Sequence, residues 1–495
     1  MKMSKARGLS VGLAMVGLFA SLTATMAPPA AAYSTDLTRA PYLSDLTSTS
    51  VRVNFGTTTS IVKTRLKYGR LSGTSCTAST AITGSTGKQG YTISYPTSTG
   101  TATATGNQWK PQLSGLSAGT YCYRMEGTTS TTSTSYTDLM GSSTASPTFT
   151  VGGSTFAVIG DWGQGGSTAP DYLNSGQANV ISQLSGSGSN FAVSTGDIGY
   201  PSGTQTSYGD LTHTGPGVSV VFGPRYWPVA GGNLPMYPVP GNHGFSSTFT
   251  SLWPSSSIAA TSNGKAANGT HSVNGSSVVV PDYWYAFDVN GWRIYILTAA
   301  WSDTVTTGAN PYAEDYQQHW APGAAERTWL ANDLAANTGK PKITVMHYPM
   351  YSAVRTGDTQ DTYLTAPPDG TQSVEKLLAT NNVKLVLNGH SHIYERNNIH
   401  NGLVSIVSGG GGASPSPVDA ASGGKCSQVY ADTGKPVVAV ARGWSSTAGS
   451  ACNGAPKPTS AAQVYHFLRV TLTSTTAKVD AIDSTGTLFD TTTVS

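Results

Sequence analysis

The sequence predicts a two-part α/β protein, in which a small β-sandwich precedes an α/β domain of two packed sheets flanked by helices. Three observations predict it. Short β-favouring runs fill residues 40–150, buried strands ending in Gly-Asp, Gly-Asn or Gly-His recur from residue 156 onward, and amphipathic helices lie between some of them. We therefore expect a boundary near residue 150, with segments 33–150 and 151–495.

The first segment carries runs such as "SVRVNFGT", "KTRLKYG" and "GTYCYRMEG", separated by Gly, Ser and Thr turns. This spacing is typical of a small β-sandwich. The polar stretch at 129–150 is of low complexity and indicates a loop leading into the next domain.

The second segment contains five short strands with polar ends, "FAVIGD", "FAVSTGD", "MYPVPGNH", "ITVMH" and "KLVLNGH". Residues 325–337 and 372–382 have apolar side chains at three- and four-residue spacing, which predicts helices. Two alternating runs joined by Asn290-Gly291 predict a hairpin. The alternating tail at 465–494 predicts antiparallel strands that complete the second sheet.

Residues 1–32 read as a secretory signal peptide, with a basic start, an apolar run over 9–24 and a small-residue Ala30-x-Ala32 step. The alternative, an uncleaved membrane anchor, is disfavoured because the run is short for a bilayer. We expect a secreted protein without stable membrane association.

Charged residues make up only 11% of the chain and the net charge is +3, which argues against a nucleic-acid partner. The 38% of hydrophobic residues, with ten Trp and 24 Tyr, are enough for a large core.

The four cysteines of an exported chain indicate disulfides, and no CxxC pair points to zinc. Three pairings are possible, and proximity in sequence favours Cys76 with Cys122 and Cys426 with Cys452.

Polar side chains gather where the five strands end. They are Asp161 in "GDWG", Asp197 and Tyr200 in "GDIGY", Asn242 and His243 in "GNHG", His347 in "VMHYP", and His390 and His392 in "NGHSHIYER". A single Gly-Asp is usually a turn, but side chains at the carboxyl ends of strands in an α/β sheet share one edge. The recurrence predicts one shared site.

Carboxylate, phenol, amide and imidazole groups suit transition-metal ions, and seven such ligands exceed what one ion needs. Two ions sharing a bridging carboxylate would use them all. Such a pair is suited to the hydrolysis of phosphate esters.

The ordered set GDxG, GDxxY, GNH, a strand-end His and GHxHxYER resembles the purple acid phosphatases of the metallophosphoesterase superfamily. The start "RAPYLSDLTSTSVRVNFGT" also resembles that family's N-terminal fibronectin type III-like domain. The resemblance covers most of the chain after residue 32. It implies a two-sheet metallophosphoesterase α/β sandwich, preceded by a small all-β fibronectin type III-like domain.

The resemblance also implies the ligand set. It assigns Asp161, Tyr200 and His392 to Fe³⁺, and Asn242, His347 and His390 to a divalent ion, which is Fe²⁺, Zn²⁺ or Mn²⁺ in different members, with Asp197 bridging both. The phenolate on ferric iron gives that family its purple colour. His243 is expected to be catalytic, stabilising charge on the phosphate or protonating the leaving alcohol. Alternatively, it orients Asn242 or Asp197.

The chain also departs from that family. Well-known members carry a further histidine after the strand-end His, whereas residues 348–389 contain none. Arg355 is a candidate for the missing charge, although it also fits a solvated loop, and the pH optimum stays open. Glu395 and Arg396 are expected to pair behind the site and Tyr394 to be a packing residue. The Gly-rich run at 406–417 is expected to be a strand end and a loop near the site.

The expected function is a secreted binuclear-metal phosphatase that hydrolyses small-molecule phosphate monoesters by attack of a metal-bound hydroxide. Two alternatives remain. The same site would also suit a phosphodiester or a nucleotide, and a non-catalytic binding protein could retain the fold. The complete ligand set argues against the last.

Overall fold

The computed structural model describes residues 33–495 apart from 74, 85–87, 98, 142–143, 167–172, 214–220, 226, 303–309, 355–360, 420–425 and 427–436. The predicted signal peptide and Arg355 lie outside the described residues.

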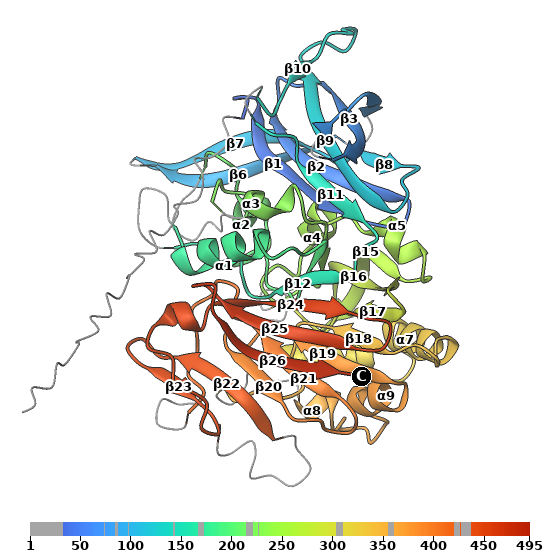
Figure 1. Ribbon diagram of the computed structural model, residues 1–495, viewed down its shortest axis with the longest axis vertical. Helices are drawn as coiled ribbons and strands as arrows, with labels where there is room; N and C mark the ends of the chain where they lie inside the picture. Colours follow the sequence, from blue (N-terminus) through green and yellow to red (C-terminus); the bar gives the residue numbers. More distant parts are fainter. Residues whose placement is uncertain are drawn as a thin grey trace, which may run out of the picture.

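The N-terminal part is β-rich, as predicted, and lies at one end of the molecule (Figure 1). Its outer sheet contains β10 (Thr137–Asp138), β9 (Gly119–Thr128), β3 (Lys63–Ser72) and β4 (Ser75–Cys76), with β11 (Thr148–Val151) and β5 (Thr80–Gly84) attached. Its inner strands are β1 (Leu37–Ser44), β2 (Ser50–Thr58), β6 (Gln89–Thr97), β7 (Gly100–Trp109) and β8 (Gln112–Ser114).

The first central sheet is built on three parallel strands, β12 (Thr155–Ile159), β13 (Phe191–Ser194) and β14 (Met236–Pro238). On one side β14 meets β1 through a single pair, Ser44 with Met236, so the sheet continues into the β-rich part. The division near residue 150 therefore stays a prediction.

On its other side the first sheet continues through the C-terminal strands β24 (His466–Leu472), β25 (Ala477–Asp483) and β26 (Leu488–Val494). Their antiparallel pairing is as predicted, but their placement in the second sheet was wrong, because β24 pairs with β12. Alternation in a strand reports which face is buried and does not identify the neighbouring strand.

The second sheet contains, in order, β15 (Lys265–Val273), β16 (Ser276–Val289), β17 (Trp292–Ile296), β18 (Lys342–Val345), β19 (Val383–Asn388), β21 (Val404–Ser408), β20 (Tyr394–Asn397), β22 (Val438–Trp444) and β23 (Gly449–Ala451). The Asn290-Gly291 hairpin is confirmed between β16 and β17, with φ of 47° and 87° at the turn.

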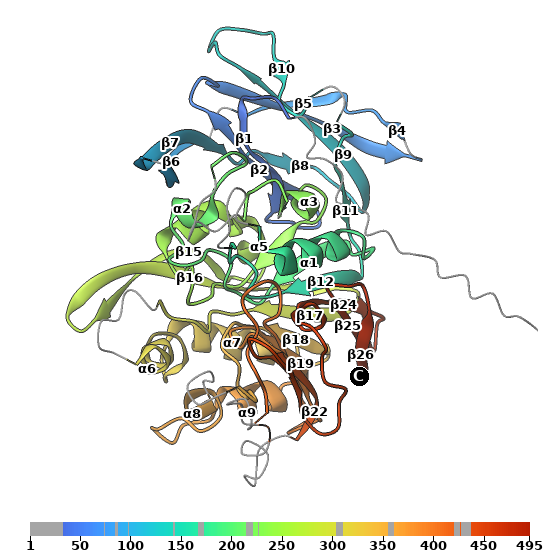
Figure 2. The ribbon, with the colours of Figure 1, turned by 90° about the vertical axis from the view of Figure 1, so that its left-hand side faces the viewer.

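The two sheets pack face to face, and helices cover their outer faces (Figure 2). The side chains of β19 alternate between the two faces of the second sheet. Leu385 and Leu387 belong to the core between the sheets, whereas Val386 belongs to the core on the helical side. The predicted helices are confirmed as α7 (Ala325–Ala336) and α9 (Val374–Thr380), and both pack on the second sheet. Helix α1 (Ser175–Ser185) packs against β24 and α3 (Pro228–Gly231).

Shorter helices fill the connections: α2 (Gln205–Tyr208), α4 (Ser247–Leu252), α5 (Ser256–Ala260), α6 (Pro311–Asp315), α8 (Asp361–Leu364) and the 3₁₀ turn Ala461–Gln463. Helix α6 runs directly into a π-helical turn, η1 (Tyr316–Trp320). None of the helices in the described part of the chain has the length and apolar character needed to cross a membrane.

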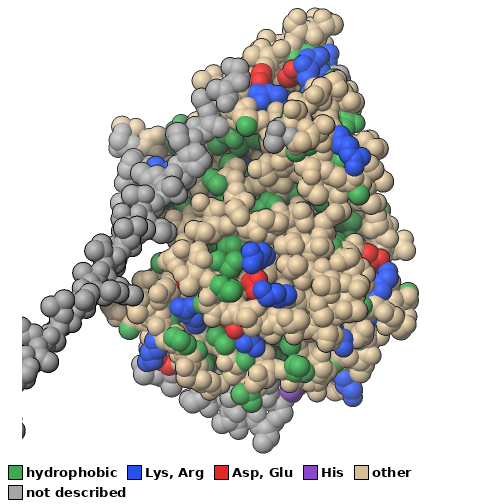
Figure 3. Space-filling model, in the orientation of Figure 1, with side chains coloured by type: hydrophobic (Ala, Val, Ile, Leu, Met, Phe, Trp, Pro, Cys, Tyr) green, Lys and Arg blue, Asp and Glu red, His purple; other side chains and the backbone are tan. Residues whose placement is uncertain are grey.

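Both predicted disulfides are confirmed, Cys76 with Cys122 and Cys426 with Cys452. The first joins β4 to β9 within the β-rich part. The face of the molecule shown in Figure 3 carries few charged side chains, scattered among neutral polar surface, in line with the composition.

Candidate metal centre

The side chains predicted to form one site come from the carboxyl ends of parallel strands in both sheets. Asp161 and Asp197 follow β12 and β13, and Asn242 follows β14 in the first sheet. His347 follows β18 in the second sheet, and β19 leads to His390 and His392. Because the sheets pack face to face, these ends meet at one edge of the sandwich, where Asp161, Asp197 and His347 are almost completely buried.

The backbone turns sharply at three of these positions. Asp161, Asp197 and His390 have φ of 55°, 49° and 68°, in the left-handed region. Non-glycine residues in this region cost about 1 kcal/mol or more each, and they cluster at functional sites. Most other such residues here are asparagines, which tolerate the conformation well.

Glycine is required beside two of these ligands. A Cβ at Gly196 would overlap the imidazole of His347, and one at Gly241 would overlap Asp197. Gly196 also has a φ of 107°, which side chains rarely tolerate.

One group of side chains gathers around the amide of Asn242. The Asn242 Oδ1 lies 2.8 Å from His347 Nε2 and 2.9 Å from His390 Nδ1. Two imidazole nitrogens therefore lie within hydrogen-bonding distance of one amide oxygen.

A second group gathers around the phenol of Tyr200. The Tyr200 Oη lies 3.3 Å from His392 Nε2, and that nitrogen lies 3.6 Å from Asp161 Oδ1. The carboxylate of Asp161 also accepts a hydrogen bond from the backbone N–H of His390, at 2.9 Å.

Asp197 lies between the two groups and contacts each with a different oxygen. Its Oδ1 lies 3.3 Å from His347 Nε2, and its Oδ2 accepts a hydrogen bond from Tyr200 at 3.0 Å. This is the placement that a bridging carboxylate needs.

Backbone carbonyls orient two of the histidines. The Nδ1 of His347 lies 2.8 Å from the carbonyl oxygen of Thr195, and the Nδ1 of His392 lies 2.9 Å from that of Ser414. An N–H bonded to a carbonyl fixes the neutral tautomer in which Nε2 carries a lone pair. The lone pair on His347 Nε2 then faces the side-chain oxygen of Asn242. Both atoms are hydrogen-bond acceptors, so a cation placed between them would satisfy both.

Burial and mutual charge shift the pKa values in this centre. Burial, followed by the nearby charge of Asp197, raises the pKa of the Asp161 carboxyl well above its usual range. Burial lowers the pKa of His390 well below its usual value, and the neighbouring histidines lower it further; burial also lowers that of His392. The imidazoles of His390 and His392 are therefore neutral, the form that binds metals, and a metal ion would stabilise the ionised form of the buried Asp161 carboxyl.

His243 follows Asn242 at the edge of this centre. Its backbone N–H donates to Asp197 Oδ1 at 2.8 Å, its Nδ1 lies 2.9 Å from the carbonyl oxygen of Pro201, and its ring stacks on Tyr200 with centroids 4.4 Å apart. Bonding of Nδ1 to the carbonyl leaves Nε2 for other partners.

Sequence reasoning missed Tyr312. Its hydroxyl lies 2.8 Å from His390 Nε2, so it contacts the nitrogen opposite the one that faces Asn242. Tyr312 lies in α6, whose only sequence signal was the helix start Asn310-Pro311, where the Asn310 side chain caps the helix. No strand-end pattern could have identified it.

The remaining residues of the "GHSHIYER" motif lie behind the centre. The expected pairing of Glu395 with Arg396 was wrong, since neighbouring residues of a strand point to opposite faces. Arg396 pairs with Asp490 at 2.6 Å, and Glu395 accepts the backbone N–H of Ala353 at 2.6 Å. Tyr394 is buried as expected, and its hydroxyl donates to Asp490.

The Gly-rich run also lies where it was expected, near the centre. It begins in β21, and a Cβ at Gly409 would closely approach the Asp161 carboxylate. The carbonyl of Ser414, which orients His392, belongs to the same run.

Comparison with known proteins agrees with this geometry. Residues 154–394 match the family model described as calcineurin-like phosphoesterase. The solved structure of a purple acid phosphatase from yellow lupin (Lupinus luteus) seeds is similar, with a TM-score of 0.55 and 15% identity, over 92% of this chain and 73% of that one. At this identity the likeness is one of fold.

Two further solved structures each match 69% of this chain. GAP50, the anchor in the inner membrane complex of Plasmodium, has a TM-score of 0.37 at 15% identity over 88% of its chain. A dimetal phosphatase from Danio rerio has a TM-score of 0.38 at 13% identity over 98% of its chain. No curated protein matches the sequence.

The matched region contains every strand end that contributes to the centre. Through residues 154–394 the chain belongs to the calcineurin-like metallophosphoesterases, and its fold, with an N-terminal β-rich part, is that of a purple acid phosphatase.

Proposed function

We propose that this protein is a secreted phosphatase that hydrolyses phosphate monoesters at a binuclear metal centre. In this proposal Asp161, Tyr200 and His392 bind Fe³⁺, and a divalent ion, Fe²⁺, Zn²⁺ or Mn²⁺, is held by Asn242, His347 and His390. Asp197 bridges the two ions. The disulfides and the predicted signal peptide support secretion, since disulfides persist in oxidising compartments.

The observation that carries the proposal is the arrangement around Asp197. Its two oxygens face two separate sets of ligands, at 3.3 Å from His347 and 3.0 Å from Tyr200. A mononuclear site would not need a carboxylate shared in this way. The tyrosine favours iron for one ion, since a phenolate is a ligand suited to Fe³⁺ in the family that the sequence resembles.

The ions would supply Lewis-acid charge for the phosphoryl oxygens and an activated water. The protein's own groups orient the ligands and transfer the proton. The carbonyls of Thr195 and Ser414 hold the imidazoles of His347 and His392 in the neutral tautomer. When protonated at both ring nitrogens, His243 would bond the Pro201 carbonyl through Nδ1 and donate its Nε2 proton to the leaving alcohol.

The first test is metal analysis with a visible spectrum. We expect about two metal ions per chain to be bound at this centre, one of them iron, and a visible band that Tyr200→Phe removes. Tyr394→Phe is the matched control, because this buried tyrosine bonds Asp490 and should leave the band unchanged. A colourless wild-type protein without iron would refute the ferric assignment.

The second test addresses the substrate. Hydrolysis of p-nitrophenyl phosphate is compared with that of its bis-ester under identical conditions. We expect the monoester to be preferred, and a clear preference for the diester would overturn this part of the proposal.

A further inference from the structure

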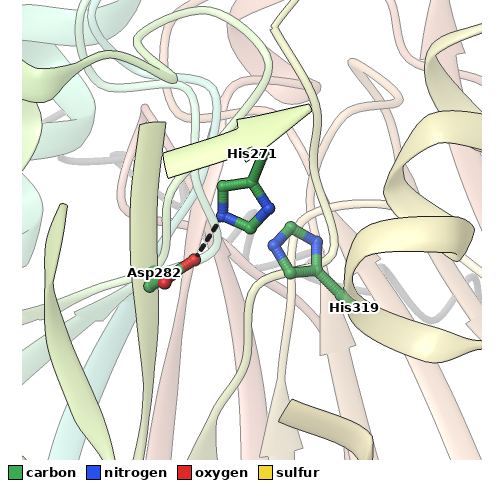
Figure 4. Close-up of side chains that lie close together, drawn as sticks. All are labelled: His271, Asp282 and His319. Atoms are coloured by element: carbon green, nitrogen blue, oxygen red, sulfur yellow. Dashed lines mark hydrogen bonds and ion pairs between the residues drawn. The ribbon is translucent and has the colours of Figure 1, made fainter. Parts of the chain in front are cut away.

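A second cluster of metal-ligand side chains lies apart from the proposed centre, and we propose that it is a structural site for a divalent transition ion, with zinc preferred. His271, Asp282 and His319 each offer one ligand atom, and these atoms all lie within 4.8 Å of one another. Figure 4 shows the three side chains converging.

The three residues come from two elements that are far apart in sequence. His271 and Asp282 lie on the same face of the β15–β16 hairpin, where Asp282 is the partner of Ala267. A Cβ at Gly269 would overlap the Asp282 carboxyl, so glycine there lets Asp282 lean across to His271. His319 belongs to η1, a π-helical turn of the kind often found at functional sites.

His319 provides the observation that points to a ligand. Its side chain is 1% exposed, and its Nε2 has no hydrogen-bond partner among the described residues. Leaving a buried polar nitrogen unsatisfied is unfavourable, and native proteins rarely do so. The nitrogen faces the other two side chains, so an ion bound there would satisfy it.

In both histidines the other ring nitrogen, Nδ1, contacts a side-chain oxygen, as is usual for histidines that bind a metal through Nε2. The Nδ1 of His319 lies 2.9 Å from Asp315 Oδ1, and the Nδ1 of His271 lies 2.9 Å from Gln318 Oε1. An outer carboxylate or amide oxygen that accepts Nδ1–H fixes the tautomer with a free Nε2 and makes that nitrogen a better ligand. Asp315 is itself held by the N–H groups of Ala300 and Trp320.

Distances and ligand chemistry favour zinc. His271 Nε2 lies 2.7 Å from Asp282 Oδ1. A tetrahedral ion with bonds of about 2.0 Å separates its ligands by roughly 3.3 Å, so small side-chain rotations are enough to admit it. Two imidazoles and a carboxylate suit zinc, with water or the second Asp282 oxygen as the fourth ligand.

The ion would tie the hairpin to the segment α6–η1, which also carries Tyr312, the partner of His390. The ring of Phe245, two residues after His243, packs on both His319 and Trp301. A structural ion here would therefore brace two of the segments that border the proposed centre.

The test counts metal ions in the full-length protein after exchange into chelator-free buffer. His319→Asn places an amide near Nδ1, which keeps the bond to Asp315, and removes Nε2. We expect it to hold one ion per chain fewer than the wild type. The control is His400→Gln, because His400 lies 2.7 Å from Glu375 in a similar pair elsewhere, and it should keep the full content. Equal contents in the wild type and His319→Asn would overturn the proposal.

A second variant keeps all three ligands. Lys265, whose side chain is 45% exposed, donates to Asp282 Oδ2 and so competes with an ion for that carboxylate. We expect Lys265→Met to bind zinc severalfold more tightly at this site in a chelator competition, whereas a purely structural histidine–aspartate contact predicts no such gain. Unchanged or weaker binding would contradict the assignment, even if His319→Asn failed to fold. Both measurements are independent of the proposed binuclear centre, because they compare variants in which that centre is intact.

Discussion

Tyr312→Phe removes one oxygen atom beside His390, a proposed ligand of the divalent ion. The Tyr312 hydroxyl lies 2.8 Å from His390 Nε2, and Nδ1 of the same ring faces Asn242. When Nδ1 binds the ion, the proton of the neutral imidazole lies on Nε2, and the hydroxyl can accept it. Phenylalanine keeps the ring, which packs edge-on against Tyr348 with centroids 4.7 Å apart.

The magnitude follows from the single contact that is lost. Loss of an outer partner of a metal-bound histidine weakens metal binding by roughly 10- to 100-fold, or about 1.4–2.7 kcal/mol. Tyr312 is only partly buried, so water can replace part of the lost bond. We therefore expect the low end of this range, about tenfold weaker binding of the divalent ion.

The assay titrates the divalent ion into protein that has been depleted of it and follows recovery of phosphatase activity. Tyr316→Phe is the control, since this tyrosine lies in the adjoining η1 and its hydroxyl donates to Asp369 at 2.7 Å. Unchanged affinity in Tyr312→Phe, or an equal loss in both variants, would refute the reasoning.

Three further predictions follow from single groups. Burial lowers the pKa of His466 to about 4 in the folded protein. As the pH falls below about 6.5 the unfolded chain therefore takes up the proton first, and about 3 kcal/mol of stability is lost by pH 4. Urea unfolding between pH 7 and 4 should show this loss, and His466→Gln should reduce it. His243→Asn keeps a donor for the Pro201 carbonyl but removes Nε2, so kcat should fall by roughly 10²–10⁴-fold while the metal content is unchanged. A lower metal content in this variant would instead favour a role for His243 in orienting the metal ligands. Replacing Cys76 and Cys122 by serine opens a loop of sequence separation 46 and should lower the free energy of unfolding by about 4 kcal/mol, measured by denaturation against the disulfide-bonded wild type.

Much of the fold could be predicted because its signals are local. The Asn290-Gly291 turn has one well-favoured conformation between alternating strands, and the apolar spacing in 325–337 specifies a helix whichever sheet it covers. The placement of β24–β26 could not be predicted, since their alternation fits either sheet and only contact with β12 decides between them.

The candidate centre divides in the same way. Strand ends that carry Asp161, Asn242 or His390 can be found in the sequence, because parallel strands bring their carboxyl ends to one edge. The sequence by itself therefore determined which side chains gather there, and the resemblance to a family suggested how they divide between two ions.

Tertiary structure alone decided what surrounds them. Tyr312 reaches His390, and His319 reaches His271 and Asp282, through contacts between segments far apart in the chain. No period or motif encodes such contacts, because they depend on how the helical segment α6–η1 packs against the second sheet. The physical reason is that a side chain's local pattern sets its direction, whereas its partner is set by the packing of whole elements.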